Sequence, residues 1–513
     1  MNSTVDLKPN ESSKPDEIIL ESTGIQGEPM LVDYSNIRNY KLNIFLWSLY
    51  DLANTIYSMG IVSLVLVPLI TIVSIASFAG VDPATLIANS ATVTKADYIA
   101  GTNYANLIYL IVVIIGNALM IVLSPIIGAY ADQLSKRKYL LGLITIFTLV
   151  FISAIAIKLS VIWILTMFLL ANLTYQTCLV IYDSMIPFIA KPQHTSKASG
   201  FGIAFGYFGS FIAIGISFIM ASGGNDYSLD EDLRMIKIGY IQEYIPIVAI
   251  AFLILGFPIL FTTEARGEHR SPSFRELVRK TFEDLRKTLR EVWQVADSRY
   301  FLIGWLLFVD AANVTIAYMS VLVTLGLGLP PSTVTFVLAI GIASAVIFTY
   351  PVGYIGDRIG PKKLFYLVGF LWISALFVGI ITNLHVFGMT TPAYFAYIMA
   401  VIVGPGLGGT WVAQRQMITE LAPKDRSSNY FGIANVFGRI SSIIGPAIVT
   451  LTLWILTKLL HQDLNTSYRV VMGVLALLLL IGLSIITRVT DHHEKYVSGY
   501  LHIGEGEWVQ FEN

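Results

Sequence analysis

The sequence predicts an all-α integral membrane protein with twelve transmembrane helices in two six-helix bundles. One reason is composition: 55% of the residues are hydrophobic and 13% are charged, whereas a soluble domain carries about 25% charged residues. A second is that the apolar residues form stretches of about 20 or more, enough for a helix to cross a hydrocarbon core of roughly 30 Å. A third is an ordered internal repeat. Because inserted backbone must satisfy its own hydrogen bonds, and the alternating pattern of barrel strands is absent, the stretches predict helices.

The apolar stretches fall into two groups of six. They span residues 44–75, 104–130, 139–158, 161–189, 199–222, 244–263, 299–328, 332–355, 363–382, 392–421, 428–457 and 467–490. The groups define an N-terminal bundle, 44–263, and a C-terminal bundle, 299–490. Residues 1–43 and 491–513 are tails, and we expect the first to be flexible because it is polar and rich in Pro, Ser and Glu.

The segment between the bundles, residues 264–298, is strongly charged. Apolar residues recur at helical spacing from Phe274 to Val292, with Arg and Lys on the remaining faces. This pattern predicts a partly amphipathic linker helix that touches anionic lipid. A regulatory site is the alternative.

Lysine and arginine gather in the loops on one side of the predicted membrane. They follow spans two, four, eight and ten: Lys136, Arg137, Lys138, Lys191, Lys197, Arg358, Lys362, Lys363, Lys424 and Arg426. The positive-inside bias therefore predicts cytoplasmic termini and a cytoplasmic linker. A net charge of −1 without a basic field gives no sign of nucleic-acid binding. The cell membrane is favoured, with a vacuolar membrane as the alternative.

The sequence carries no recognisable catalytic or cofactor motif. Its single cysteine, Cys178, excludes an intrachain disulfide. A phosphate-binding loop and a metal-spaced histidine cluster are both absent from the sequence. We therefore expect a protein that is not an enzyme and needs neither a cofactor nor a metal.

Three short motifs occur once in each half, in the same order. Asp51–Asn54 in span one matches Asp310–Asn313 in span seven, and Phe201–Ala204 in span five is identical to Phe431–Ala434 in span eleven. A glycine–acid–basic motif closes spans two and eight, with the residues Gly128, Asp132 and Arg137, then Gly353, Asp357, Arg358 and Lys362. Chance would not keep this order, so the halves are parallel repeats about an axis along the membrane normal.

The glycine–acid–basic motif resembles the cytoplasmic loop motif of the major facilitator superfamily. The first copy departs from it at Gln133, where the motif usually has Arg. Within that superfamily, the segment from Trp47 through Tyr50 and Asp51 to Asn54 looks like the first-span signature of the autophagy-related vacuolar amino-acid effluxers and their prokaryotic relatives. The resemblance implies export of amino acids from a compartment or cell.

Two acids lie inside apolar spans, Asp51 and Asp310, each with an asparagine one turn later, Asn54 and Asn313. A charge at such a depth costs about 2.5–3.5 kcal/mol on insertion scales. Each acid could carry a proton or contact a substrate ammonium. The alternative is a structural Asp bonded to Asn and backbone where helices pack. Two tyrosines share the face of Asn54 and could line the same wall, or serve in packing: Tyr50 and Tyr57.

Arg439 is the deepest cation, with Asn435 one turn before it on the same face of span eleven. A guanidinium suits bidentate capture of a carboxylate, such as that of an amino acid. The alternative is an internal ion pair that locks one conformation. Span four adds Asn172 and Gln176 as candidate substrate contacts.

Asp183 in span four and Arg415 in span ten lie near the predicted cytoplasmic ends of their helices. We expect them to join the charged residues of the loop motifs in ion pairs that close an inner gate. The gate residues are Gly128, Asp132, Arg137, Asp183, Gly353, Asp357, Arg358, Lys362 and Arg415. The alternative for the loop charges is that they only fix membrane orientation.

These features predict a secondary active transporter that moves a small polar solute, with amino acids as the first candidate, by proton-coupled alternating access. Its partners would be that solute, protons and the lipid bilayer, and we expect it to work as a monomer. The runner-up is a sugar or drug exporter. A non-transporting membrane sensor with the same fold is a further alternative.

Overall fold

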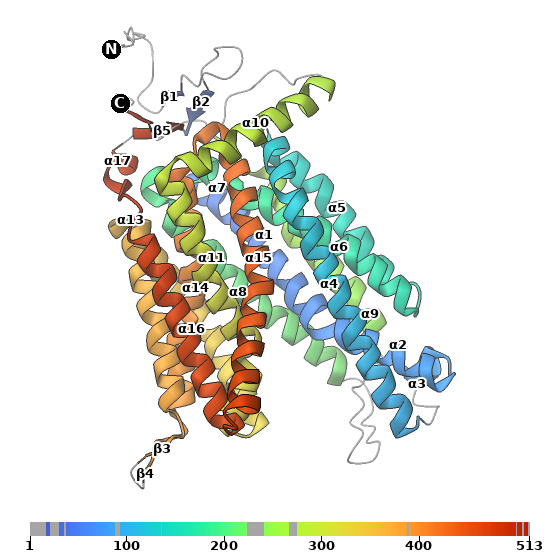
Figure 1. Ribbon diagram of the computed structural model, residues 1–513. Helices are drawn as coiled ribbons and strands as arrows, with labels where there is room; N and C mark the ends of the chain where they lie inside the picture. The colour runs from blue at the N-terminus through green and yellow to red at the C-terminus, as the bar shows by residue number, and fades with distance from the viewer. Residues whose placement is uncertain are drawn as a thin grey trace.

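The computed structural model describes residues 17–20, 30–34, 37–87, 93–134, 136–222, 241–265, 274–386, 389–498, 500–504 and 507–510. Long helices make up almost all of this described part (Figure 1). Their apolar composition explains the choice, because backbone in hydrocarbon can satisfy its hydrogen bonds within a helix.

The N-terminal half contains the first six predicted spans. Its long helices are α1 Tyr40–Tyr57, α2 Val67–Ala79, α4 Lys95–Asp132, α5 Arg137–Ile155, α6 Val161–Ser184, α8 Thr195–Ser222 and α9 Ile241–Gly256. A π-helical segment, Ser58–Leu66, joins α1 to α2 into one span. The shorter elements are α3 Pro83–Ile87, α7 Ile186–Ile189, and 3-10 turns at Pro192–His194 and Phe257–Phe261.

The C-terminal half follows the linker helix α10, Phe274–Gln294. Its long helices are α11 Ala296–Ala317, α13 Pro331–Ile381, α14 Phe395–Leu421, α15 Ser427–Trp454 and α16 Leu464–Ile486. Short segments complete it: α12 Met319–Val321, π-helical Leu322–Gly326, 3-10 Lys424–Arg426, π-helical Ile455–Leu459 and α17 His493–Val497.

Within the described residues, eleven helical segments are long and apolar enough to cross a membrane. One of them lies in α13, whose 51 residues contain a break at Gly360. The backbone of Gly360 has φ 81 and ψ 164, a conformation essentially restricted to glycine. Predicted spans eight and nine lie on either side of this break, so the predicted twelve-span fold is confirmed.

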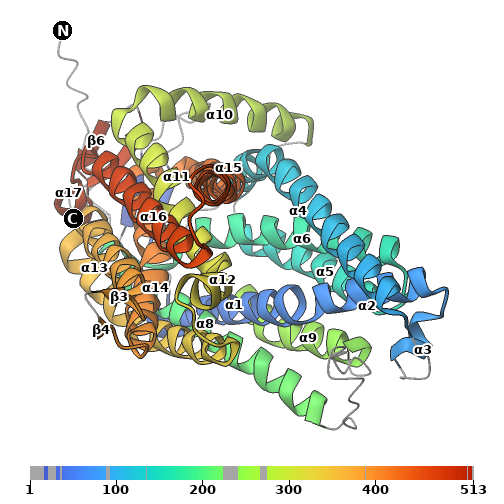
Figure 2. The ribbon, with the colours of Figure 1, turned by 60° about the horizontal axis from the view of Figure 1, so that its bottom comes forward.

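The two halves converge at one end of the molecule and diverge at the other (Figure 1). Across the boundary, α4 packs against α15 and α8 packs against α13. The convergent end carries the described strands of both tails, α10 and the lysine- and arginine-rich loops, and we call it the basic end. Seen from below, α10 runs along the outer edge of the molecule beside α15 and α4 (Figure 2).

Both tails contain more structure than expected. In the first, which we expected to be flexible, β1 Glu17–Leu20 pairs antiparallel with β2 Met30–Asp33. Each strand contains a short run of apolar residues, which favours extended pairing despite the polar surroundings. Tyr34 then anchors this tail by donating a hydrogen bond to the Pro187 carbonyl at 2.7 Å. The helix of span one begins at Tyr40 rather than 44, with Asn39 as its N-cap.

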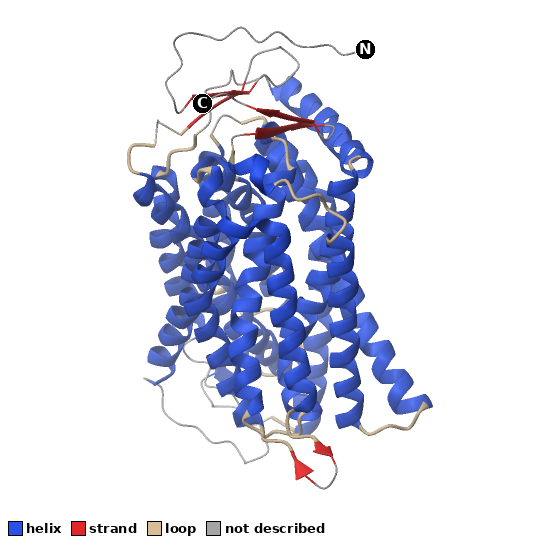
Figure 3. Ribbon diagram, turned by 90° about the vertical axis from the view of Figure 1, so that its left-hand side faces the viewer, coloured by secondary structure: helices blue, strands red, loops and turns tan. Residues whose placement is uncertain are grey.

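The C-terminal tail contains α17 and the hairpin of β5 Tyr500–Gly504 with β6 Glu507–Gln510. A third hairpin, β3 His385–Val386 with β4 Met389–Thr390, lies at the opposite end of the molecule (Figure 3).

Candidate functional site

A cluster of three charges, two buried and one half-buried, joins the two halves near the basic end. Arg415 of α14 places Nη1 3.0 Å from Asp51 Oδ2 of α1 and Nη2 2.8 Å from Asp183 Oδ1 of α6. The guanidinium also lies over the rings of Trp47 and Tyr182, 5.7 and 5.4 Å from their centroids. One cation thus holds two carboxylates, and the cluster has a formal charge of −1.

Asp183 and Arg415 form the ion pair that the sequence predicts between them, and Asp51 joins the same cluster. Asp183 and Arg415 occupy corresponding positions in the two repeats, two residues before Met185 and Met417. They therefore face each other across the axis that relates the halves. Asp51, predicted as a proton or substrate site, also lies in this ion cluster, because α1 runs beside α8 at the boundary between the halves.

The acid of the first loop motif caps a helix of the opposite half. Asp132 accepts hydrogen bonds from the backbone N–H groups of Ser428 and Asn429, at 2.9 and 2.8 Å, in the first turn of α15. It also pairs with the buried Arg137, with Nη2 2.6 Å from Oδ1. The first N–H groups of a helix have no partner inside the helix, and the helix dipole favours an anion there.

The second motif repeats this arrangement in the opposite direction. Asp357 of α13 accepts from the N–H groups of Ser196 and Lys197, at 2.8 and 3.1 Å, in the first turn of α8. Each half therefore caps a helix of the other, as expected from a pseudo-twofold axis.

The motif glycines allow the two halves to touch. A Cβ added at Gly128 would lie 2.3 Å from the Ser428 carbonyl oxygen, and one at Gly353 would lie 2.5 Å from that of Ser196. A side chain at either position would push the halves apart. The glycine of the motif is thus required by close backbone approach.

The remaining basic residues of the second motif do not cross the boundary. Arg358 is exposed and donates to the Tyr354 hydroxyl, with its guanidinium 4.4 Å from the ring centroid. The expected ion pair across the gate is therefore not formed by Arg358. Arg358 follows Asp357 by one residue, which is a rotation of about 100° around the helix, so the side chain of Arg358 points away from α8. Lys362 is half-buried just after the Gly360 break.

A second polar cluster lies near the midpoints of α4, α6 and α15. Arg439 donates through Nη2 to Gln176 Oε1 and through Nη1 to Asn117 Oδ1, the latter at 3.4 Å. Gln176 in turn donates to Asn172 Oδ1 at 3.4 Å. All four side chains are half-buried, and so is Asn435 one turn before Arg439. In the described part of the chain, no carboxylate lies within ion-pair distance of Arg439.

Sequence reasoning did not single out Asn117. A signal was available, because this residue is an isolated amide in the apolar span 104–130. An amide in hydrocarbon needs a partner, and Asn117 has two on α15, since it also donates to the Ser442 hydroxyl at 3.3 Å.

Asp310, predicted as a proton or substrate site or as a structural residue, lies in a tight helix seam. Asp310 is only 1% exposed and lies where α11 packs against α15. A Cβ added at Gly445 would lie 2.4 Å from Asp310 Oδ1, so that glycine makes room for the carboxylate. This position fits the structural alternative. Asn313 is half-buried one turn later.

Three further residues of the predicted wall on α1 are buried in packing. Tyr50 is fully buried, with its hydroxyl 2.5 Å from Thr145 Oγ1 of α5. Tyr57 is also fully buried and packs against Tyr175 and Phe252. Asn54 is 2% exposed. The face of α1 that bears them packs within its own half, because α5, α6 and α9 cover it.

The C-terminal tail binds to the basic end beside the gate. His493 Nδ1 lies 2.8 Å from Glu420 Oε1 of α14, and its Nε2 lies 3.1 Å from the Asp357 carbonyl oxygen. Glu420 accepts from Gln416 at 3.1 Å, and Gln416 is bonded to Ser196 of the other half. Lys424 donates to the buried Tyr496 hydroxyl at 3.2 Å. The tail thus contacts the same helix ends that close the gate.

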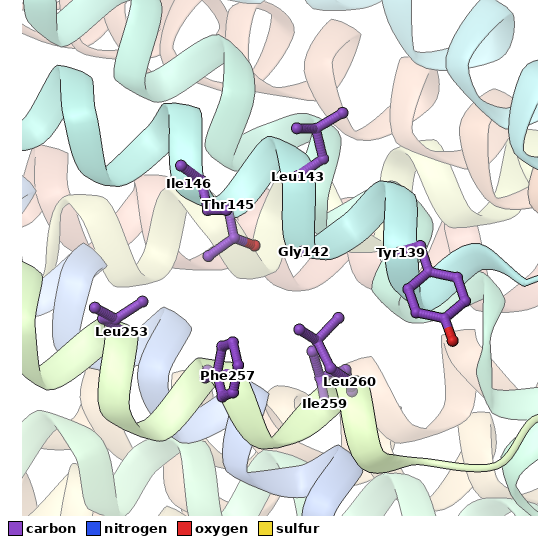
Figure 4. Close-up of a pocket in the computed structure, with 10 residues that line it drawn as sticks. Tyr139, Gly142, Leu143, Thr145, Ile146, Leu253, Phe257, Ile259 and Leu260 are labelled. Carbon is purple, nitrogen blue, oxygen red and sulfur yellow. The ribbon is translucent and has the colours of Figure 1, made fainter.

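An apolar pocket of about 270 Å³ lies between α5 and the end of α9, away from both polar clusters. The close-up shows Leu143, Ile146, Leu253, Phe257 and Leu260 around it (Figure 4). Its lining lies within one half and contains no charged residue, so it is not part of the candidate site.

Two repeated halves, closed at one end by reciprocal helix caps, define a transporter of the major facilitator type. The fold matches the human organic anion transporter MFSD10 with a TM-score of 0.59 at 11% identity, covering 87% of this chain and 99% of that one. It also matches a bacterial homologue of the iron transporter ferroportin in an outward-facing state, with a TM-score of 0.59 at 12% identity, covering 87% and 98%.

The family model described as "Vacuole effluxer Atg22 like" matches residues 39–496. This chain belongs to that family, and the resemblance found in the sequence is confirmed. An uncharacterized MFS-type transporter of Bacillus subtilis, YxiO, is 24% identical over 418 residues, which cover 79% of this chain and 87% of the relative. Autophagy-related protein 22 of Yarrowia lipolytica is 27% identical over 285 residues, which cover 51% and 47%.

Replacing Asp132 by Ala should shift the protein toward a state with the basic end open. The change removes the cap of α15 and the partner of Arg137. Loss of a cap costs about 1 kcal/mol, so the population of the open state should rise about fivefold. Spin labels at Lys136 and Arg488, in a Cys178→Ala background, should show longer distances across the basic end.

Asp463→Ala is a matched control, because it removes the N-cap of α16 at the opposite end without crossing the boundary. Equal distance changes in both variants would show that the Asp132 contacts do not hold the halves together.

Attachment of the tail should weaken as pH rises. Burial lowers the pKa of His493, but Glu420 and the Asp357 carbonyl oxygen raise it more, so the net pKa lies above its usual value. The stabilisation by charged His493 is therefore full below the ordinary histidine pKa of about 6.5 and is lost as pH rises through the raised value. Burial lowers the pKa of Lys424 to about 7, so Lys424 does not replace the lost charge.

A spin label at the exposed Lys495 should become more mobile across this pH range in the native sequence. His493→Gln should remove most of the pH dependence, whereas His385→Gln, at the exposed β3–β4 hairpin, should leave it intact. A label whose mobility is unaffected by His493→Gln at every pH would contradict the assignment.

Proposed function

We propose that this protein is a secondary active transporter that moves an amino-acid-like solute by proton-coupled alternating access, with its basic end in the cytoplasm. The observation that carries the proposal is the half-buried Arg439, which is surrounded by amides and has no carboxylate partner among the described residues.

A carboxylate is the substrate group that this environment favours. An arginine at mid-membrane is costly unless something balances its charge. The amide oxygens of Gln176 and Asn117 orient the guanidinium but do not neutralise it. A guanidinium binds a carboxylate with two parallel hydrogen bonds. Amide oxygens of Asn172 and Asn435 could accept from the ammonium group of the same solute.

Arg439 also links substrate binding to the movement of the halves. It lies on α15 of the second half, and its hydrogen-bond partners lie on α4 and α6 of the first half. A solute bound between these helices would contact both halves. It would change the balance between the two states only by its different affinity for each of them.

The cluster of Asp51, Asp183 and Arg415 supports proton coupling. It holds two carboxylates and one guanidinium in a buried place, so it has an excess negative charge that a proton would neutralise. When the basic end opens, Arg415 would move away from the first half and leave both acids without their partner. The gate and the proton site would then be the same residues, which gives a direct physical link between them.

The direction that we propose is supported by the family, because the matching model describes a vacuole effluxer. A vacuole effluxer moves solute from the vacuole lumen into the cytoplasm, and the lumen corresponds topologically to the outside of a cell. In a cell membrane the corresponding direction is therefore into the cytoplasm. The basic end is closed in this structure, since the described bonds between the halves lie between the helix midpoints and that end.

Arg439→Gln should weaken substrate binding by about tenfold or more, since hydrogen bonds to charged groups contribute about 1.5–3 kcal/mol. Uptake of radiolabelled amino acids, sugars and cationic drugs into proteoliposomes would identify the substrate class. Arg488→Gln, on an exposed arginine, is the matched control. Equal transport of an amine that lacks the carboxylate, or unchanged affinity in Arg439→Gln, would exclude the carboxylate site.

Asp183→Asn should abolish uptake driven by a pH gradient while keeping solute exchange across the membrane. Exchange needs alternating access but no net proton movement, so it separates coupling from transport. Asp310→Asn is the matched control, because Asp310 lies in a helix seam. Loss of coupling in Asp310→Asn with coupling intact in Asp183→Asn would move the proton site to span seven.

A further inference from the structure

The linker helix α10 is fastened to both halves at the basic end. Gln133, in the first loop motif, donates through Nε2 to Asp284 of α10. Glu291 of α10 forms a buried ion pair with Arg426, which directly precedes α15. Thr281 and Thr288 are buried on the same side of the helix. The acidic and small polar side of α10 therefore faces the ends of α4 and α15, which meet at the gate.

The opposite side of α10 is exposed, apolar and basic at once. Phe282, Leu289 and Trp293 are 55%, 40% and 52% exposed. They are seven and four residues apart, which places them on one stripe of the helix. The cations Arg286 and Arg290 lie on or beside this stripe and are exposed.

This combination of residues suits neither water nor hydrocarbon alone. Large apolar side chains on a cytoplasmic helix would be poorly solvated, and cations inside the hydrocarbon would be costly. At the membrane interface, Phe and Trp enter the boundary of the acyl chains while Arg and Lys reach the headgroups. Its position at the outer edge of the molecule, beside α4 and α15, places α10 where that interface can be reached (Figure 2).

The charge of the exposed side identifies the lipid. Arg279, Arg286, Lys287 and Arg290 are all exposed there. Among residues 279–294 of α10, whose burial is described, Glu283 is the one exposed acid, and it pairs with Arg279 at 3.5 Å. The excess is positive, so the complementary surface is a leaflet with anionic headgroups.

We propose that the exposed side of α10 is a binding surface for anionic phospholipid, and that lipid bound there holds the basic end closed. The mechanical link is the opposite side of the same helix. Glu291 forms an ion pair with Arg426 at the start of α15, and the first N–H groups of α15 bond to Asp132. Asp284 accepts a hydrogen bond from Gln133, which is next to Asp132 in the chain. Lipid that fixes α10 against the membrane therefore restrains both halves. This inference concerns lipid and not the transported solute, so it does not rest on the proposed substrate.

The test uses the full chain with Cys178→Ala and a spin label at position 287, placed in nanodiscs of phosphatidylcholine with or without phosphatidylglycerol. Collision with oxygen and with a water-soluble relaxant reports the depth of the label. We expect the label to move from water to the interface when phosphatidylglycerol is added. Labels at Lys136 and Arg488 should then show a larger population with short distances across the basic end.

The triple variant Arg279→Gln, Arg286→Gln, Arg290→Gln should lose both responses. These side chains are exposed, so their replacement should leave the fold intact. A matched triple variant at the opposite end, Lys95→Gln, Lys158→Gln, Lys458→Gln, removes the same number of exposed cations and should behave as the parent. The double variant Phe282→Ser, Trp293→Ser should also lose insertion while keeping all the charges.

Three results would overturn the proposal. A label at the same depth with and without phosphatidylglycerol would show that lipid charge is not recognised. A label in water in both bilayers would leave the face free for a soluble partner. Insertion without any change in the distance between Lys136 and Arg488 would separate lipid binding from the gate. None of these readouts measures transport, so they are independent of whether the proposed solute is correct.

Discussion

The reciprocal capping of helices between the two halves is the interaction on which the closed end depends. Asp132 and Asp357 each bind two backbone N–H groups of the opposite half. Those groups have no partner within their own helices, so they must find one in every state of the molecule. At a membrane surface water can replace the carboxylate at small cost. The caps are therefore strong enough to define one state and weak enough to release, and Gly128 and Gly353 provide the close approach that they need.

The internal repeat gives the two halves symmetric contacts at the closed end, but the charged residues of the halves are arranged asymmetrically. The acid of each loop motif caps a helix of the opposite half. The tetrads that begin at Asp51 and Asp310 make different contacts, because the residues opposite the two acids differ. Position 415 is an arginine that reaches Asp51, whereas the corresponding position 183 is itself an acid. Asp310 thus has no equivalent cation and lies in the helix seam against Gly445. The residues that the repeats share form the contacts that close the basic end. The buried ion cluster depends on positions where the repeats differ.

Hydropathy and the repeats were sufficient to predict the transmembrane helices and the fold, because these depend on local composition and on the order of motifs. They could not predict which side chains meet. Asp51 and Arg415 are 364 residues apart, and their contact depends on the rotation of two helices. Arg358 differs from Asp357 by one position, yet it points away from the boundary. The docking of His493 depends on a short tail whose composition gives no pattern, and Gly360, whose added Cβ would lie 2.7 Å from His493, is visible only in the backbone.

The networks of the molecule divide into two roles by position. The caps, the Arg415 cluster, the tail at Glu420 and the linker helix all lie at the basic end. The cluster around Arg439 lies deeper and has no carboxylate of its own among the described residues. The charge of Arg439 is not balanced by a described carboxylate, and the bonds between the halves gather at the basic end. We infer that the protein without solute favours closure of the basic end. A solute that supplies the missing carboxylate can oppose that preference only if it binds Arg439 more tightly once the basic end has opened.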